Sequence, residues 1–361
     1  MPEPPERSSM KRRELNEIKK QFTPAGCTID RIAGCIANDE GDIMYEMNEK
    51  FINIPEKKMF KFFEIFRKGL SGRKGKNIYS LEFKEDSGAK ASLQHIRQMG
   101  LKDEETNEIL FENIIDYCSI KGYFAVFAIY GIYDIPGKGT DNETVEDASE
   151  EVYEYIMTAI CPVVLSKAGL SWSREENTMG EAKRQWMIGM PNTAFLYPAF
   201  TDRSQDLDHV WFYTKNDNDP EKGLIDQVLG CKMFDTPHEQ KEEFNRTVKG
   251  GEHSTYSMKQ VKDLYRELQT LAENQKESEE PITAEQIAKI VRKYGIDREG
   301  TDTEISLQNV INLNTMEIGT TEAHVTISTG WEDIVDIKEV EGKRYITVRA
   351  DGSITVNGIE V

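Results

Sequence analysis

Apolar residues recur at helical spacing in the first third of the chain. In the segment 11–22, Leu15, Ile18 and Phe22 fall on one face of a helix, and Pro24 ends it. Similar spacings of three and four residues follow in three further segments. The pattern therefore predicts helices over residues 11–22, 55–70, 89–99 and 103–118.

Between residues 123 and 215 the pattern changes to β-branched and aromatic runs separated by turn residues. The run 123–135 is rich in Phe, Val, Ile and Tyr, as a central strand is. Few helical patterns interrupt these strands, which favours an α+β fold over repeated strand–helix–strand units. We expect a mostly antiparallel or mixed sheet with flanking helices on one side. The predicted strands are 27–37, 77–83, 123–135, 152–160, 186–188, 194–200 and 210–214.

The pattern turns helical again after residue 220 and becomes β-rich near the end of the chain. Thr236, Ser257 and Thr283 each occupy a capping position before an apolar helical stripe. We expect five parts: a disordered tail at 1–10, an α+β core at 11–235, a helical segment at 236–295, a connector at 296–320 and a small C-terminal β unit at 321–361.

Charge and hydropathy narrow the possible partners. The 361 residues include 45 Lys and Arg and 64 Asp and Glu, for a net charge of −19, and residues 101–361 alone carry −23. An acidic surface repels a phosphate backbone, so the composition disfavours nucleic acid as a partner. No window has the ~18 uninterrupted apolar residues of a membrane helix, and the N-terminus lacks the apolar core of a secretory signal. We therefore expect a cytoplasmic protein without a membrane partner.

The cysteine and histidine patterns predict no metal and no cofactor. The five histidines are scattered and match no metal-binding spacing. The cysteines are widely spaced, and none forms a Cys-x-x-Cys pair. In a cytosolic protein we expect all five to be reduced thiols. They are Cys27, Cys35, Cys118, Cys161 and Cys231.

One dense basic run is a candidate anion-binding site. Five cations and three glycines fall within ten residues, and the cations are Arg67, Lys68, Arg73, Lys74 and Lys76. Backbone N–H groups of a glycine-rich loop can hold a phosphate while the cations neutralise it. The spacing does not match a Walker loop, and the same cations could instead form a solvated helix end that offsets the helix dipole. Weak nucleic-acid or polyanion binding through residues 67–76 is one functional hypothesis.

Arg184, Asp202 and Arg203 form the second candidate site. Asp202 and Arg203 lie between two predicted strands, where loops often present binding residues, and Arg184 is near in sequence. An arginine at such a position could bind a carboxylate or phosphate of a small ligand. Alternatively, Asp202 caps the turn and pairs with Arg203.

Several long segments resemble a bacterial family of domains of unknown function. They are RRELNEIKKQFTPAGCTIDRIAGC at 12–35, YIMTAICPVVLSKAGL at 155–170, GMPNTAFLYPAFTDRS at 189–204, VWFYTK at 210–215 and TVNGIEV at 355–361. The resemblance extends over residues 10–361. It implies a cytosolic bacterial protein and supplies no activity, cofactor or catalytic residue.

For every candidate acid–base, metal-binding or phosphate-binding motif, a purely structural role explains the residues equally well or better. The leading hypothesis is therefore a non-enzymatic binding or interaction protein with an unknown protein or small-molecule partner. The alternative is an enzyme or small-ligand-binding protein with a polar cleft around Arg184, Asp202 and Arg203. These hypotheses differ in whether the polar groups converge in one concave pocket.

Overall fold

The computed structural model divides the chain into two compact units, the sheet unit (Met1–Thr236) and the helical unit (Pro237–Val361). The structure describes residues 11–138, 144–145, 151–249, 256–278, 281–312, 315–319, 321, 324–328, 334–350, 352, 355–356 and 359–360. The disordered tail predicted at 1–10 lies outside the described residues.

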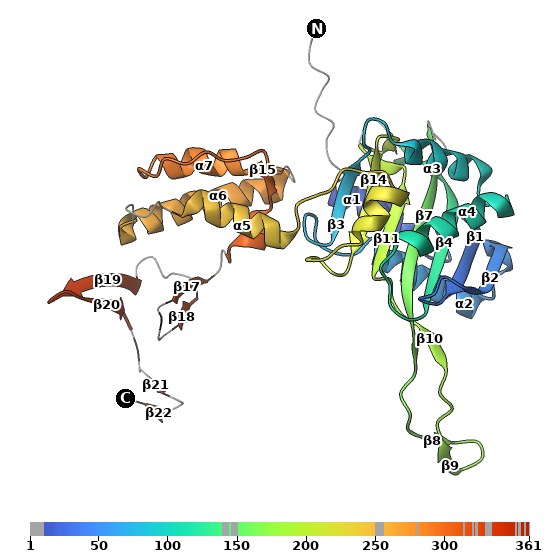
Figure 1. Ribbon diagram of the computed structural model, residues 1–361. Coiled ribbons are helices and arrows are strands. Elements are labelled where there is room, and N and C mark those ends of the chain that lie inside the picture. Colours follow the sequence, from blue (N-terminus) through green and yellow to red (C-terminus); the bar gives the residue numbers. More distant parts are fainter. Residues whose placement is uncertain are drawn as a thin grey trace, which may run out of the picture. The chain divides into compact units, whose positions relative to one another are not determined.

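An eight-stranded sheet forms the centre of the sheet unit (Figure 1). Its strands are β1 (Ile29–Ala37), β2 (Ile43–Lys50), β3 (Ile78–Glu82), β4 (Phe124–Ile135), β7 (Glu151–Leu165), β10 (Trp186–Ile188), β11 (Thr193–Tyr197) and β14 (His209–Thr214). The order is β2-β1-β4-β7-β11-β14-β3, with β10 paired to β7, and every pairing is antiparallel. The α+β fold with a mostly antiparallel sheet is confirmed.

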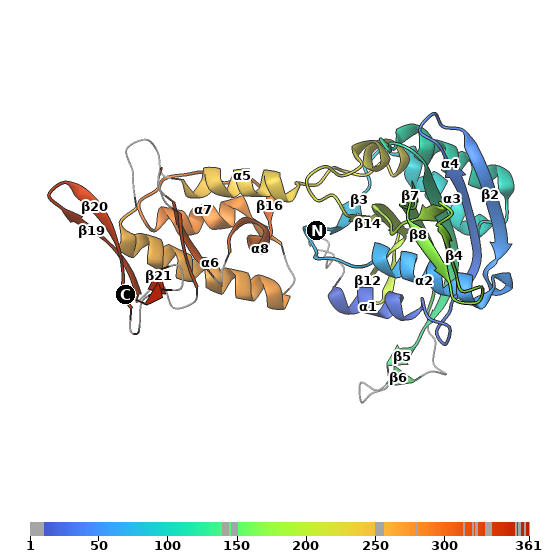
Figure 2. The ribbon, with the colours of Figure 1, turned by 90° about the horizontal axis from the view of Figure 1, so that it is seen from below.

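Helices cover both faces of this sheet (Figure 2). On one side lie α1 (Arg12–Lys20) and α2 (Glu56–Gly69), and on the other lie α3 (Gly88–Met99), α4 (Glu104–Tyr117) and the π-helix η2 (Leu224–Val228). The expectation of helices on one side alone is wrong. In β4, Phe127 and Ile129 enter one core while Val126 and Ala128 enter the other. A strand buried on both faces produces the near-continuous apolar run seen in its sequence.

β7 and β10 continue beyond the sheet as a projecting two-stranded ribbon, the arm (residues 163–190) (Figure 1). The end of the arm is the hairpin of β8 (Leu170–Ser173) and β9 (Thr178–Glu181). Two backbone hydrogen bonds of 2.8 Å, from Ser166 N to Gln185 O and from Ala182 N to Gly169 O, join the two segments of the arm between β10 and the hairpin.

Short elements complete the sheet unit. They are the 3₁₀ helix η1 (Phe51–Asn53) and the strands β5 (Gly137–Lys138), β6 (Thr144–Val145), β12 (Ala199–Thr201) and β13 (Ser204–Asp206). β5 pairs with β6, and β12 pairs with β13 through a turn of two residues. The β12–β13 hairpin follows β11 directly and carries two of the residues that the sequence proposed for a site.

Helices dominate the core of the helical unit. Its elements are α5 (Pro237–Val248), α6 (Met258–Ser278), α7 (Ala284–Arg292), α8 (Leu307–Val310), β15 (Ile282–Thr283) and β16 (Glu304–Ile305). Thr283 caps α7, with its hydroxyl accepting from Gln286 N at 3.3 Å. The stretch from 296 was expected to be a connector, yet Ile296, Ile305 and Leu307 are buried in the helical core. The spacing of these apolar residues fits neither the helical nor the strand period, so the sequence pattern did not predict that they are buried.

Three small hairpins follow in the helical unit. They pair β17 (Met316–Gly319) with β18 (His324–Ile327), β19 (Val335–Val340) with β20 (Lys343–Val348), and β21 (Thr355–Val356) with β22 (Ile359–Glu360). Lys262 Nζ on α6 donates to the carbonyl of the buried Val335 at 2.8 Å. Among the described helices, none combines the length and apolar character needed to cross a membrane.

A substitution at Gly131 on β4 tests the close packing between the two central strands, β4 and β7. A Cβ added there would overlap the ring of Tyr155 on β7. That ring is fully buried and stacks on Tyr153 at a centroid distance of 5.2 Å, so it cannot move aside. We expect Gly131→Ala to lower the unfolding free energy of the sheet unit by about 1–3 kcal/mol in chemical denaturation.

Gly180→Ala is the matched control, because a Cβ at this strand position in the arm meets no atom within 4 Å. The control should stay within about 0.5 kcal/mol of the wild type. Equal stability of the two variants would contradict the packing described for β4 and β7.

Candidate functional site

Asp202 and Arg203 form the two-residue turn between β12 and β13. Both have positive φ angles, 49° and 60° respectively, as a type I′ hairpin turn requires. A left-handed backbone is unfavourable for arginine, so contacts around the turn have to compensate for it. Helix α1 supplies those contacts.

Glu14 joins α1 to this turn. Its Oε1 accepts a hydrogen bond from Asp202 N at 2.8 Å, and its Oε2 accepts one from Lys11 N at 2.6 Å. Lys11 Nζ lies 3.3 Å from Asp202 Oδ1. Glu14 is fully buried, and this burial raises its pKa although the two N–H groups act in the opposite direction. A buried carboxyl group whose two oxygens both accept hydrogen bonds from backbone N–H groups has a structural role.

Arg203 is also bonded within the sheet unit. Its Nη2 donates to the Pro136 carbonyl at 2.8 Å and lies 3.2 Å from Glu17 Oε1 on α1. The Tyr133 hydroxyl donates to the same Glu17 oxygen at 2.9 Å. Burial, followed by the hydrogen bond to Glu17, raises the pKa of Tyr133. Arg203 therefore has a structural role, and the acid that it pairs with is Glu17 on α1.

Arg184 lies at the other end of β7. Its Nε donates to the carbonyl of Ser166, directly after the last residue of β7, at 3.0 Å. Arg203 binds Pro136, next to Ile135, which pairs with the first residue of β7. The 15 residues of β7 span roughly 45 Å at the usual strand rise. The structure therefore does not bring Arg184 together with Asp202 and Arg203 in one cleft.

Two faces of the arm differ sharply in composition. Trp172 pairs directly with Met179, and Leu170 precedes Trp172 by two residues, so the three side chains share one face. They are 62%, 76% and 81% exposed, respectively. Glu181 pairs with Leu170 and shares this face. The opposite face of the hairpin carries only small residues, namely Ser171, Ser173, Thr178 and Gly180.

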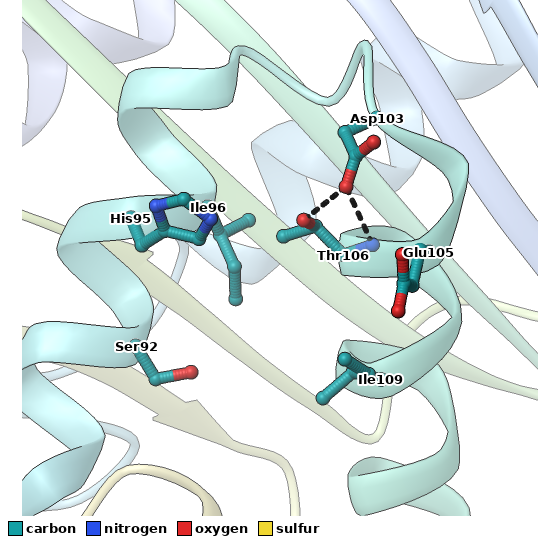
Figure 3. A pocket seen from close by; sticks show the side chains of 7 residues that line it. All are labelled: Ser92, His95, Ile96, Asp103, Glu105, Thr106 and Ile109. Atoms are coloured by element: carbon teal, nitrogen blue, oxygen red, sulfur yellow. Dashed lines mark hydrogen bonds between the residues drawn. The ribbon is translucent and has the colours of Figure 1, made fainter.

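A hollow of about 310 Å³ lies between α3 and α4 (Figure 3). Figure 3 shows Asp103 directed at Thr106, whose backbone N donates to it at 2.9 Å. Hydrogen bonds from the hydroxyl and then from the backbone N–H of Thr106 lower the pKa of Asp103, which is the N-cap of α4. The Asp103 carboxylate therefore caps α4. No sequence motif predicts a binding site in this hollow. Its lining residues are Ser92, His95, Ile96, Asp103, Glu105, Thr106 and Ile109.

A further polar cluster, which the sequence analysis missed, lies on β13 and β14 beside α3. His209 Nδ1 is 2.8 Å from Asp206 Oδ2, and Arg97 on α3 donates to Gln205 Oε1 at 2.9 Å. An aspartate that orients an imidazole occurs in general-base sites. The same contact also closes the short connection between the two strands. The only sequence signal was the segment 205–209 (QDLDH), whose composition is equally typical of a turn.

The basic run at 67–76 is divided by the fold. Arg67 and Lys68 are exposed in the last turn of α2, and Arg73 and Lys74 are exposed in the loop that leads to β3. Lys76 is only half-exposed and lies 3.1 Å from Asp217. The last of the five cations is therefore already neutralised.

Helix α1 adds positive charge next to the end of α2. Burial lowers the pKa of Lys19, and the nearby charges of Arg12, Arg67 and Lys68 lower it further. These four cations form the basic surface of the sheet unit. The sequence signal was the pair of doublets Arg12-Arg13 and Lys19-Lys20, which only the packing of α1 places beside α2.

A comparison with protein families matches nearly the whole chain. A family model described as a domain of unknown function, DUF4317, matches residues 10–359. The chain belongs to the DUF4317 family. The match confirms the nearly full-length resemblance seen in the sequence. No curated protein matches the chain.

Neither thiols nor acidic groups of this DUF4317 chain form a metal site in the described part. No group of three or more His, Cys, Asp or Glu side chains there could hold an ion. All five cysteines are free. Burial raises the pKa of Cys35, Cys161 and Cys231 to about 12, which keeps these three thiols protonated and poorly nucleophilic at neutral pH.

A substitution at Tyr133 tests the structural role of Arg203 and Glu17 in this family member. We expect Tyr133→Phe to cost about 1 kcal/mol of unfolding free energy at neutral pH, because the Glu17 oxygen loses a donor. The pKa of Tyr133 is raised in the folded state, so the unfolded chain releases this proton first, at pH about 10. The wild type should therefore lose stability as pH rises above about 10, and the difference from the variant should narrow.

Denaturant unfolding of both proteins at neutral pH and at pH about 10 to 11 measures this difference. Other buried tyrosines titrate equally in both proteins, so they cancel in the comparison. A difference that stays constant or widens with pH would refute the assigned hydrogen bond.

Proposed function

We propose that this chain is a non-enzymatic interaction protein that binds another protein through the apolar face of the arm. The carrying observation is that Leu170, Trp172 and Met179 share one exposed face while the opposite face is small and polar. These three side chains leave roughly 400 Å² of apolar surface uncovered, at ~200 Å² for a large side chain. A patch of this size is as large as the largest apolar patch of a typical monomer, which is often functional.

The polar groups support the same proposal. Glu14 and Arg203 are bonded to backbone groups within the sheet unit, and Arg184 is bonded to Ser166 in the arm. The large apolar side chains of Trp172 and Met179, in contrast, are exposed to solvent. Partner binding is therefore better supported than catalysis in a cleft around Arg184, Asp202 and Arg203.

Bacterial origin and a cytoplasmic location are part of this proposal. They rest on the sequence resemblance and on five cysteines that are all free, as is usual in a reducing compartment.

Photocrosslinking in the host cell tests the function. A photoreactive aromatic residue replaces Leu170 on the apolar face, or Ser171 on the small polar face as the matched control. We expect a covalent protein adduct from position 170 and at least ~10-fold less from position 171, because only the first lies in a desolvated interface. Adduct formation is measured by denaturing electrophoresis and mass spectrometry. Equal yields, or none from position 170, would contradict the proposal.

Polyanion binding at the basic surface is a second candidate function. The positions of Arg12, Arg67 and Lys68 support it, because these cations lie close enough to Lys19 to lower its pKa beyond the larger effect of burial. A bound polyanion relieves the repulsion between these cations, whereas the acidic remainder of the chain opposes it. Binding of this kind is local and sensitive to salt.

Replacing both Arg67 and Lys68 with Ala tests this candidate. Four contacted phosphates would give the wild type a log–log salt slope of about −3.6 on duplex DNA, and the double variant should retain about half of it. Lys57→Ala with Lys61→Ala is the matched control, since it removes the same charge from α2 and Lys61 already pairs with Glu64 at 2.9 Å. Titrations at several salt concentrations measure the slopes. A control that loses as much slope as the double variant rules out a specific basic surface.

A further inference from the structure

The outward face of α2 carries apolar and positive side chains on the same stripe. Phe60 and Arg67 are seven residues apart, which is about two turns of an α-helix, so they point to the same side. Phe60 is 43% exposed, and Arg67 is exposed too. The acids on this helix are Glu56 and Glu64, and Glu64 lies 2.9 Å from Lys61. One flat partner can therefore touch an apolar and a positive side chain of α2 at the same time.

Helix α1 continues the positive charge on the same side of the sheet. Its residues Arg12, Arg13 and Lys20 are exposed. Its two acids contribute little to this surface, because Glu14 is buried and Glu17 is half-buried. Both helices pack on the same core. Their outward faces therefore form one broad basic surface, although the chain as a whole carries a net charge of −19.

Ile52 adds a second apolar side chain at the start of α2. It lies in η1 and is 83% exposed. The ring centroids of Phe60 and Phe63 are 6.4 Å apart, and those of Phe63 and Phe51 are 5.5 Å apart. These contacts place η1 beside the first half of α2. Because Ile52 directly follows Phe51, the exposed Ile52 and Phe60 lie near one end of α2, while Arg67 and its neighbouring cations lie at the other.

Among polyanions, this combination of side chains favours an anionic bilayer. Lipid phosphates neutralise the cations, and the boundary between headgroups and acyl chains accepts apolar side chains. A nucleic acid matches only the cations, because its phosphates offer no apolar surface and the aliphatic Ile52 has no ring to stack on a base. Salt screens charges farther away than about 8 Å. Acidic groups beyond that distance from the bilayer therefore oppose the contact only weakly.

We propose that the polyanion bound by the basic surface is an anionic lipid bilayer, on which α1 and α2 lie with Ile52 and Phe60 inserted below the headgroups. This inference rests on the polyanion binding proposed above as a second candidate function and names the polyanion. The sequence predicted no membrane partner because no segment could span a bilayer. Docking on the surface of a bilayer requires no spanning segment.

Cosedimentation of the full chain with vesicles tests the proposal. One set of vesicles is phosphatidylcholine alone, and the other is an equal mixture of phosphatidylcholine and phosphatidylglycerol. The wild type should bind the mixed vesicles and leave the neutral vesicles unbound. Each cation near an anionic surface strengthens binding roughly fivefold. Replacing both Arg67 and Lys68 with Ala should therefore weaken binding to the mixed vesicles at least ~10-fold.

Ile52→Ser with Phe60→Ser distinguishes a bilayer from a nucleic acid. This serine variant should bind the mixed vesicles at least ~10-fold more weakly, because less apolar surface enters the bilayer. Its affinity for duplex DNA should stay within about threefold of the wild type, because no charge changes. Should thermal unfolding show that the double variant does not fold, Ile52→Ser alone replaces it, since that side chain is 83% exposed.

Met99→Ser with Ile109→Ser is the matched control for the serine variant. It removes two exposed apolar side chains from α3 and α4, which cover the opposite face of the sheet. This control should bind both the mixed vesicles and duplex DNA as the wild type does. A control that loses as much vesicle binding as the serine variant overturns the assigned surface.

The pattern of losses separates the bilayer from polyanion binding in general. DNA binding without binding to the mixed vesicles overturns the bilayer and keeps polyanion binding, whereas binding to neither overturns both. Equal binding to neutral and mixed vesicles overturns the bilayer as well. So does a serine variant that binds the mixed vesicles as the wild type does, or one that loses as much DNA binding as vesicle binding. Vesicle binding lost in both variants, with DNA binding weakened only in the alanine variant, supports the bilayer.

Discussion

Burial of β7 on both of its faces is the constraint on which the sheet unit depends. Tyr155 and Met157 enter the core beneath α1 and α2, while Ile156 and Ile160 enter the core beneath α3 and α4. A strand of this kind needs a helical layer on each side, because its apolar side chains point alternately to both. The antiparallel neighbours β4 and β11 repeat the alternation. After Val163, β7 passes beyond this cover and leads into the arm.

Sequence patterns located most of the elements that are rich in apolar residues. The helices at 11–22, 55–70, 89–99 and 103–118 and the strand at 123–135 all correspond to elements of the structure. β2 escaped prediction because Met47 is its only buried residue, so it has almost no periodicity. β8 and β9 escaped because their apolar residues face solvent, where the usual assumption that apolar means buried fails. The two-sided cover of the sheet was readable in principle from the unbroken apolar run of β4.

Candidate sites were harder to predict than elements, because they depend on which distant segments pair. Arg184 and Arg203 are near in sequence, and the length of β7 separates them in the fold. Glu14 was invisible as a site residue, although it bonds to Asp202 from a helix at the other end of the sheet unit's chain. Lys19 joins Arg67 only because α1 and α2 cover the same face. In each case the sequence showed a charged residue but not the residue that it contacts. That contact depends on the order of the strands, which is a property of the whole sheet.

The position of β3 bears on how the chain folds during synthesis. β3 closes the far edge of the described sheet, where Leu81 pairs with Val210 of β14. A ribosome therefore releases β3 long before the strand that receives it. The Phe63 and Phe66 side chains of α2 likewise lack part of their packing surface until β7 and β11, which α2 contacts, have been synthesised. The loop between the paired strands is long, so its closure slows folding. The sheet unit thus completes its fold only after β14 has left the exit tunnel, and a chain truncated before β14 keeps the edge of β11 open.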